Sequence, residues 1–513
     1  MQAYVVSYSK YIIAIALAVY TLTAYFALPV RRGKNPFFLL LMQRLCWIVF
    51  MVNATLTLWK LGGEDSKILL SGALCVIVFL AFMLLYQALY DKAHVMLFNN
   101  ICMMLSIGLV IITRINYAKA QKQFLIASAG LAIILFFPIL RGKLDYLKHI
   151  WLLYALAGLG MIGIVLLSGR SDNGANILFT LRGFTFQPSE LVKILFLLFL
   201  AGAFSGGVSG FRVFVTFMIA MAHVGILLLS SDLGAAMIFY VVYFMMLYIA
   251  TGRFRFLTWG FVMGVIGAVA CYFLFAHLRV RVEMWLDPWT YINEGGYQIT
   301  QALFAISFGG WFGAGLFQGI PSNIPFVESD FIFAAIAEEM GLVTAICLVL
   351  LCLNIFIDIL VLSEQYSNRF FRMFTFGTGV MYIFQTFVTV AGETKFIPLT
   401  GVTLPLVSYG GSSVLSTLIL FGIVGSIFIL HGEREEAFRQ QMNLEAARMK
   451  ELRRQEELRR QEELRRRQEA AQGTGILGRR KKKQKTGPGG FTMDDPRFQP
   501  GASIFGDDGE THF

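Results

Sequence analysis

Long apolar runs separated by short polar ones fill most of the chain, and this pattern determines the expected fold. The runs span about 17–25 residues without strict alternation, which predicts membrane-crossing helices and excludes the strands of a membrane β-barrel. About thirteen such segments can be placed. They lie near residues 11–28, 37–61, 68–90, 95–113, 124–140, 151–168, 191–206, 212–230, 234–250, 258–277, 331–361, 370–391 and 411–430. We therefore expect an all-α polytopic membrane protein.

Composition supports this class and narrows the chemistry. Hydrophobic residues make up 57% of the 513 residues and charged residues only 15%, which is too little charge for a soluble chain of this length. The 6 cysteines all lie inside apolar runs without metal-ligand spacing, so we expect them to pack in the core. The 6 histidines are scattered, which argues against a histidine metal centre. No cleavable signal peptide is expected, and nothing points to nucleic acid.

Basic residues between the runs predict the orientation in the membrane. With the N-terminus outside, four basic segments face the cytoplasm, as the positive-inside rule requires. These segments are Arg31–Lys34, Arg141–Lys148, Arg253–Arg255 and the tail after His431. The long loop 278–330 then faces the extracytoplasmic side. One basic segment, Arg114–Lys122, also falls outside and is the exception to the rule.

The tail from residue 432 to 513 differs from the rest in composition. Its ELRRQEE units repeat with a period of six, so Leu452, Leu458 and Leu464 do not share one helical stripe and a coiled coil is not expected. Favourably ordered Glu–Arg pairs at i,i+4 predict a solvated single helix. The basic run Arg479–Lys483 is a candidate for contact with anionic lipid. The Gly/Pro-rich end after Thr486 is expected to be disordered.

Three polar segments interrupt the apolar pattern and carry the candidate chemistry. The loop contains four carboxylates between two apolar runs: Asp287, Glu294, Glu328 and Asp330. Such groups are costly at a membrane boundary unless they have partners or a function.

The second segment, 187–193, opens a span with Glu190 and Lys193 on one helical face. Helix capping explains Ser189 and Glu190 as well as function does, and the same holds for Asp232 before a later span. Lys193 lies a turn into apolar sequence and is a candidate contact for an anionic headgroup.

The third segment, 397–413, contains two prolines and three glycines that break a helix. Ser408 and Tyr409 supply donors there, and Lys395 lies just before it. Non-helical backbone survives at membrane depth only where protein or a water-filled cavity satisfies it, so we expect a re-entrant or hairpin element that lines a cavity.

Taken in order, FQPSELVK, SDLGAA, the DPW…GGYQITQALFAISFGGWFGAGL loop, SDFIFAAIAEEMG and LPLVSYGGSS closely resemble the SEDS family, the FtsW/RodA/SpoVE group. The match runs over about 95–431. The resemblance implies a ten-span core in the bacterial cytoplasmic membrane that polymerises lipid II into peptidoglycan on its outer face, for division, elongation or sporulation. It also implies a class B penicillin-binding protein as partner. The chain would then divide into three added spans (1–92), the core (93–431) and the charged tail (432–513).

The resemblance implies a carboxylate base that deprotonates the acceptor sugar, with inversion at the donor carbon. In the family this acidic residue sits in a second Asp-Pro shortly before the Gly-Tyr pair, where an ungapped match places Tyr291. We therefore expect Asp287 to be the base and keep Glu294 as the alternative, with a degenerate site as the third option. Asp287 is equally suited to be a turn residue before Pro288.

The pyrophosphate needs cations, and five basic residues near the outer face are candidates: Arg182, Lys193, Arg279, Arg281 and Lys395. Asp330 is a candidate for orienting the loop, for binding a divalent cation or for capping the next helix. Glu190, Ser408 and Tyr409 complete the expected substrate site. No other cofactor is expected.

Two other functions fit part of the pattern. A flippase for the lipid-linked precursor would use the same intramembrane charges but needs a polar lining through the whole membrane. A scaffold with a decayed catalytic loop would explain the missing second Asp-Pro. The concentration of acidic residues on one side favours catalysis at a surface.

Overall fold

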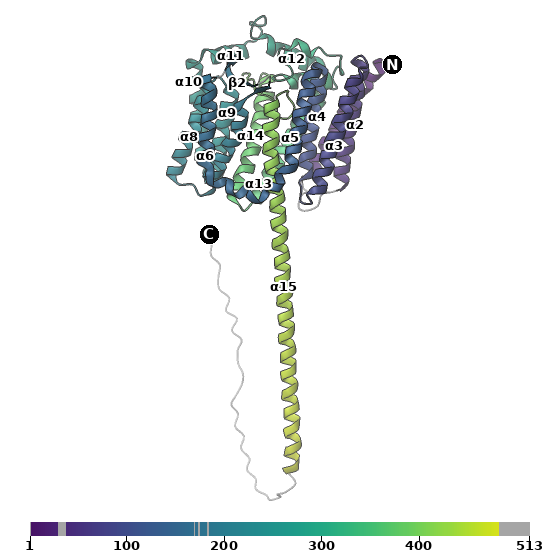
Figure 1. The fold of residues 1–513 in the computed structure, drawn as a ribbon, viewed down its shortest axis with the longest axis vertical. Helices are drawn as coiled ribbons and strands as arrows, with labels where there is room; N and C mark the ends of the chain where they lie inside the picture. The colour runs from purple at the N-terminus through teal and green to yellow at the C-terminus, as the bar shows by residue number, and fades with distance from the viewer. Residues whose placement is uncertain (1, 29–36, 169, 173–174, 182–183, 482–513) are drawn as a thin grey trace, which may run out of the picture. The chain divides into compact units, whose positions relative to one another are not determined.

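The structure is a computed structural model that describes residues 2–28, 37–168, 170–172, 175–181 and 184–481. The chain divides into two compact units, Met1–Glu436 and Ala437–Phe513. The first unit is a bundle of helices (Figure 1). The predicted boundaries after residues 92 and 431 stay predictions.

Each predicted apolar segment coincides with a helix, which confirms the polytopic all-α class. Among the described residues, twelve helical stretches are long and apolar enough to cross a membrane, and one of them, Tyr117–Leu167, joins two helices through a 3-10 segment. The helices are α1 (Gln2–Phe26), α2 (Phe37–Leu61), α3 (Ser66–Leu89), α4 (Val95–Ile115), α5 (Tyr117–Phe136), η2 (Phe137–Ile150), α6 (Trp151–Ser168), α7 (Pro188–Ser205), α8 (Gly210–Leu229), α9 (Leu233–Thr251), α10 (Arg255–Leu274), α11 (Ala276–Leu286), α12 (Tyr297–Gly309), η3 (Pro321–Asn323), α13 (Ile332–Gln365), α14 (Arg369–Glu393) and α15 (Gly411–Lys481).

Burial separates central helices from lipid-facing ones. Helix α4 is buried along its whole apolar window, and α7 and α14 are mostly buried. Helix α10 exposes nearly all of its apolar side chains, including Phe261 and Ile266. A helix that is apolar on all sides and lies at the edge of a bundle is suited to contact lipid tails, so α10 marks a membrane-facing side.

The first three helices are built into the bundle. Tyr20 of α1 donates to Asn100 Oδ1 of α4 at 3.1 Å, and Asn100 Nδ2 donates to Asn354 Oδ1 of α13 at 3.0 Å. Trp47 of α2 donates to Ser106 Oγ of α4 at 2.9 Å. These buried hydrogen bonds satisfy polar groups that would be costly if left unpaired.

The N-terminal end of α1 lies at the same end of the bundle as α11, α12 and the long loop (Figure 1). Lys10 Nζ donates to the carbonyl of Gly313 in that loop at 3.1 Å, and the Tyr11 ring lies 5.1 Å from the Phe312 ring. This agrees with the prediction that the N-terminus and the loop face the same side of the membrane.

A short antiparallel sheet was not expected from the sequence. Its strands are β1 (Arg170–Asp172), β2 (Ala175–Leu181) and β3 (Phe184–Phe186), in the order β1-β2-β3 between α6 and α7. The apolar-run pattern cannot reveal strands this short.

The second unit is helical as far as the structure describes it. Helix α15 continues to Lys481, and its side chains from Glu435 to Ala470 are exposed. Arg465 Nε lies 3.1 Å from Glu469 Oε1, an i,i+4 pair. The expected solvated helix is confirmed for these residues. The predicted disorder after Thr486 lies outside the described residues, as do Lys482 and Lys483 of the basic run before it.

Helix α13 is broken at Gly341, which has φ 88° and ψ 168°. The loop after α12 pairs with the break through four backbone hydrogen bonds: Ala314 N to Glu338 O, Gly315 N to Glu339 O, Leu342 N to Gly310 O and Val343 N to Trp311 O, at 2.9–3.0 Å. Backbone groups released from the helix therefore find partners in the loop, as a non-aqueous environment demands.

Gly341→Ala should destabilise the protein. A Cβ at this position would lie 2.2 Å from the Gly313 nitrogen, and a side chain in this glycine-only backbone conformation costs about 1–3 kcal/mol. We expect a lower midpoint of thermal unfolding in detergent. Gly163→Ala in α6 is the matched control, since a Cβ there meets nothing within 4 Å and alanine favours a helix. Equal midpoints for the two variants would contradict the proposed strain.

Candidate functional site

A polar cavity of about 1260 Å³ lies between the start of α5, the start of α9, helix α11, the long loop and the segment before α15. Seven charged side chains line it: Lys119, Lys122, Asp232, Arg281, Glu294, Glu328 and Asp330. A cavity of this size with several convergent charges is the default candidate for a binding site.

The prediction of a non-helical segment that lines a cavity is confirmed, and its re-entrant or hairpin course in the membrane stays a prediction. Residues 397–410 form no regular secondary structure, and several of them line the cavity. Ser408 organises this segment: its Oγ donates to Ser329 O at 2.6 Å and accepts from Leu404 N at 2.9 Å, while its carbonyl accepts from Gln123 Nε2 at 2.9 Å. Ser408 is buried and does not line the cavity. Its predicted contact with substrate stays a prediction, and its observed contacts support the loop.

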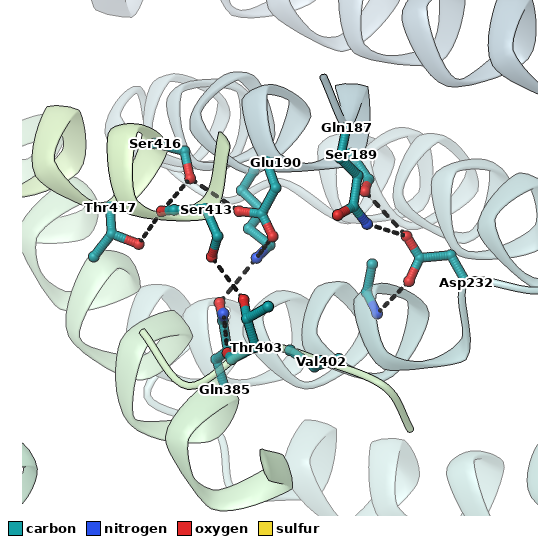
Figure 2. Close-up of polar contacts among 12 residues, drawn as sticks. Gln187, Ser189, Glu190, Asp232, Gln385, Val402, Thr403, Ser413, Ser416 and Thr417 are labelled. Atoms are coloured by element: carbon teal, nitrogen blue, oxygen red, sulfur yellow. Dashed lines mark hydrogen bonds and ion pairs between the residues drawn. The ribbon is translucent and has the colours of Figure 1, made fainter. Parts of the chain in front are cut away.

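Asp232 and Asp330 both line the cavity. Asp232 caps α9 by accepting from Ala235 N at 3.1 Å, and it also accepts from Ser189 Oγ at 3.0 Å and Gln187 Nε2 at 3.4 Å (Figure 2). Burial raises the pKa of Asp232. The capping interpretation of Asp232 is therefore confirmed, and the sequence did not show that the same carboxylate also lines the cavity.

Asp330 lies immediately before α13 and shares the cavity with Arg281 of α11. Partial burial raises the pKa of Asp330, and the Arg281 charge opposes this shift. Arg281 is attracted by both Asp330 and Asp232, and its Nη1 donates to Leu399 O at 3.0 Å. One guanidinium thus links two acidic groups to the re-entrant segment. Of the candidate cations, Arg281 is placed in the cavity wall.

Lys119 and Lys122 at the start of α5 are cavity residues that the sequence analysis did not select. Lys119 forms an ion pair with Glu328, and its Nζ lies 5.7 Å from the centroid of the Tyr409 ring. Both lysines belong to the basic segment that broke the positive-inside rule. That exception could have identified the two lysines as candidates for the site, because basic residues on the outer side need an anionic partner there.

The two candidate bases occupy different environments. Glu294 lines the cavity, whereas Asp287 does not. Asp287 is the C-cap of α11 and accepts from Thr290 Oγ1 at 2.7 Å and Thr290 N at 3.3 Å, in the turn geometry that was its alternative explanation. The hydrogen bond from the Thr290 hydroxyl holds the pKa of the exposed Asp287 below its usual value. Its assignment as the base stays a prediction.

Glu190 and Lys193 lie in a buried network rather than in the cavity wall. Figure 2 shows Glu190 in this network with Ser416 and Gln385. Lys193 Nζ lies 2.8 Å from both Glu190 Oε1 and Gln385 Oε1, and Ser416 Oγ donates to Glu190 Oε2 at 2.9 Å. The network joins α7, α14 and α15. Because the Lys193 ammonium already has two acceptors, it is not free to bind pyrophosphate in this conformation, and that role stays a prediction.

The remaining candidates are not brought to the cavity. Lys395 Nζ lies 3.5 Å from Leu286 O, and Arg279 lies 5.8 Å from the centroid of the Tyr272 ring. Neither lines the cavity. Arg182 lies outside the described residues. Within the described chain, no group of three or more His, Cys, Asp or Glu residues could hold a metal ion, so the divalent cation stays a prediction.

Known proteins share much of this sequence. The sequence model of the FtsW/RodA/SpoVE family, described as "Cell cycle protein", matches residues 89–431. The chain belongs to this family. It is 31% identical over 391 residues to peptidoglycan glycosyltransferase RodA of Mycobacterium tuberculosis (strain ATCC 25618 / H37Rv), covering 68% of this chain and 83% of that relative. It is 36% identical over 301 residues to the probable peptidoglycan glycosyltransferase FtsW of Aliivibrio salmonicida, covering 56% and 72%.

Two solved structures share the fold. One is a chain of a peptidoglycan synthase complex that coordinates polymerization and crosslinking, with a TM-score of 0.56 and 28% identity over 66% of this chain and 97% of that one. The other is rod shape determining protein RodA of Thermus thermophilus, with a TM-score of 0.50 and 26% identity over 67% and 97%. The SEDS resemblance and the multi-pass location in the cytoplasmic membrane are confirmed. Helices α1 and α2 and nearly all of α3 precede the matched segment.

Lys193→Met should destabilise the protein strongly, because it leaves the buried Glu190 carboxylate without its cation. Breaking one side of a buried ion pair costs about 3–5 kcal/mol. The double variant Glu190→Gln/Lys193→Met removes both charges and should recover much of the thermal stability in detergent. If Lys193→Met unfolded at the wild-type temperature, the structural role of the pair would be wrong.

Proposed function

We propose that this protein is a glycosyltransferase that polymerises lipid II into peptidoglycan glycan strands at the outer face of the cytoplasmic membrane. The observation that carries the proposal is the gathering of four carboxylates and three cations around one large cavity at the loop end of the bundle. Family membership supports it, and so do the names of the curated relatives. A cavity open at a membrane surface suits a substrate whose lipid part stays in the bilayer.

The reaction needs a base for the acceptor and stabilisation of the leaving group. A carboxylate takes the proton of the acceptor sugar hydroxyl while the oxygen attacks the anomeric carbon of the donor. The new glycosidic bond forms with inversion as the bond to pyrophosphate breaks, and the polyprenyl pyrophosphate leaves with the electron pair.

Glu294 is the better placed of the two candidate bases. Its side chain lines the cavity, and among the described residues none donates a hydrogen bond to its carboxylate as Thr290 does to that of Asp287. Glu294 also precedes the Gly295-Gly296 pair by one residue, close to where the family carries its acidic residue. We therefore assign the general base to Glu294 and place Asp287 second.

The cations of the cavity suit a pyrophosphate. Lys119 and Lys122 approach from α5 and Arg281 from α11. Arg281 is influenced by the charges of Asp330 and Asp232, and Lys119 pairs with Glu328, so Lys122 carries the charge that remains for the substrate. Charge-assisted hydrogen bonds to phosphate are among the stronger polar contacts. Asp330 then serves to position Arg281.

The partner we propose is a class B penicillin-binding protein that crosslinks the strands. The structural relative from a complex coordinating polymerization and crosslinking supports this pairing.

Glu294→Gln should lower kcat for polymerisation of labelled lipid II by about 10²- to 10⁴-fold, the range that a positioned general base contributes. Asp287→Asn should lower it much less. The full-length protein would be assayed in detergent with a partner transpeptidase, and the glycan strands would be separated on a gel.

Glu283→Gln is the control, since Glu283 lies on α11 but does not line the cavity. Loss of polymer in Asp287→Asn with activity retained in Glu294→Gln would reverse the assignment of the base. Absence of polymer from the wild type under every partner condition, together with headgroup translocation in vesicles, would overturn the proposed function in favour of a flippase.

Lys122→Gln should raise KM for lipid II by roughly three- to tenfold, because a single charge-assisted contact is worth about 1.5–3 kcal/mol before solvent screening. Raising the ionic strength should increase the wild-type KM more than that of the variant. Lys143→Gln in η2, on the predicted cytoplasmic side, is the matched control. Unchanged KM and unchanged salt dependence in Lys122→Gln would remove this lysine from the site.

A further inference from the structure

A second, apolar groove of about 340 Å³ lies between α2, α3, α4 and α5. Its lining includes Met51 and Thr55 of α2, Cys75 of α3 and Val110 of α4. Half of the groove is thus built from helices that precede the segment matched by the family. The core alone would not form it.

The groove is open sideways and closed at one end. Leu74 of α3 is 43% exposed and Leu125 of α5 is 67% exposed, so the lining reaches the lipid-facing surface between these helices. At the loop end, Tyr117 OH donates to Lys67 O at 3.0 Å and Gln121 Nε2 donates to Tyr117 OH at 3.1 Å. An apolar chain can therefore enter from the bilayer just beneath a polar rim.

Helix α5 lies between this groove and the polar cavity. Successive residues of an α-helix are about 100° apart, which places Lys119 and Lys122 on one side and Ala120 and Phe124 on the other. The lining residues agree: the two lysines line the cavity, and Ala120 and Phe124 line the groove. Leu125 lines both. The route from the cations to the groove therefore runs around the exposed side of α5.

We propose that this groove binds the isoprenoid chain of the lipid-linked substrate, with the phosphates held at Lys119 and Lys122. The inference rests on the proposed function and adds a subsite for the lipid part. The occupant must carry an anionic group joined directly to a long apolar chain, because the charged lining of the cavity and the apolar lining of the groove meet at Leu125. A polyprenyl phosphate has both features, and its sugar can lie in the cavity beside Glu294 while its chain remains in the membrane.

The contact between the isoprenoid chain and the groove is expected to contribute moderately to the free energy of substrate binding. Lipid tails are as apolar as the groove, so no hydrophobic transfer drives the chain into it, and only packing and pre-ordering favour it. The groove should therefore affect KM rather than kcat.

Photo-crosslinking tests the groove without requiring activity. The full-length protein in nanodiscs would be exposed to a diazirine-bearing polyprenyl phosphate, and labelled peptides would be mapped by mass spectrometry. We expect labelling in 71–75 and 121–125 well above that in α10, whose Phe261 and Ile266 face lipid. A diazirine phospholipid is the comparison probe. Equal labelling of α10 and the groove by the polyprenyl probe, or equal labelling of the groove by both probes, would overturn the proposal and indicate ordinary membrane lipid.

A groove-filling variant tests its use by substrate. Ser71→Phe places a large ring into the lining, whereas Ala73→Phe, two residues away, lies on an exposed position of α3 that does not line the groove. Ser71→Phe should raise KM for a lipid II with the full-length polyprenyl chain roughly three- to tenfold and leave KM for a short-chain analogue unchanged. Ala73→Phe should change neither.

The outcomes separate the two proposals. Equal effects of Ser71→Phe on long- and short-chain substrates, or no effect on either, would overturn the groove while polymerisation by the wild type upheld the proposed function. A wild type that makes no polymer would overturn the proposed function, and the crosslinking pattern would still decide whether the groove binds polyprenyl chains.

Discussion

Backbone that leaves the helical conformation at membrane depth must find hydrogen-bond partners within the protein, and the candidate site depends on how this chain meets that demand. Two breaks do so in different ways. At Gly341 the released groups of α13 pair with the loop after α12. In 397–410 the side chains of Ser408 and Gln123 take the place of helical partners. The second break lines the polar cavity, and the first fixes the loop that follows α12.

The charges around the cavity follow the same logic of mutual compensation. The basic segment Arg114–Lys122, the exception to the positive-inside rule, supplies several of the compensating cations. Arg114 Nε lies 3.0 Å from Glu339 Oε1, and Lys119 pairs with Glu328. Arg114 also donates to Gly319 O, and Glu338 accepts from Ile320 N, so two buried carboxylates hold the far part of the loop. Each of these three carboxylates thus has a donor. Among the described residues, Lys122 lines the cavity without a carboxylate within ion-pair distance.

The fold could be predicted from the sequence to a large extent, the site only in part. Apolar run length locates helices because the bilayer sets that length, and prolines and glycines locate the re-entrant element for a similarly local reason. Asp287 shows where such reasoning stops: its Asp-Pro suggested a base, but the direction of its side chain depends on Thr290 and on the course of the loop. For Lys193, spacing cannot reveal that Gln385, 192 residues later, lies beside it, and its role as a headgroup contact stays a prediction. The sequence did signal Lys119 and Lys122, because both belong to a basic segment on the predicted outer side of the membrane. It could not show which groups lie beside them.

The hydrogen bonds of α1 and α2 fasten the first helices to the core. Asn100 and Ser106 lie in α4, whose apolar window is wholly buried, and Tyr20 and Trp47 donate to them. Truncation before residue 92 would remove both donors and uncover this face of α4. The matched core would then meet lipid with polar side chains that are now enclosed by protein.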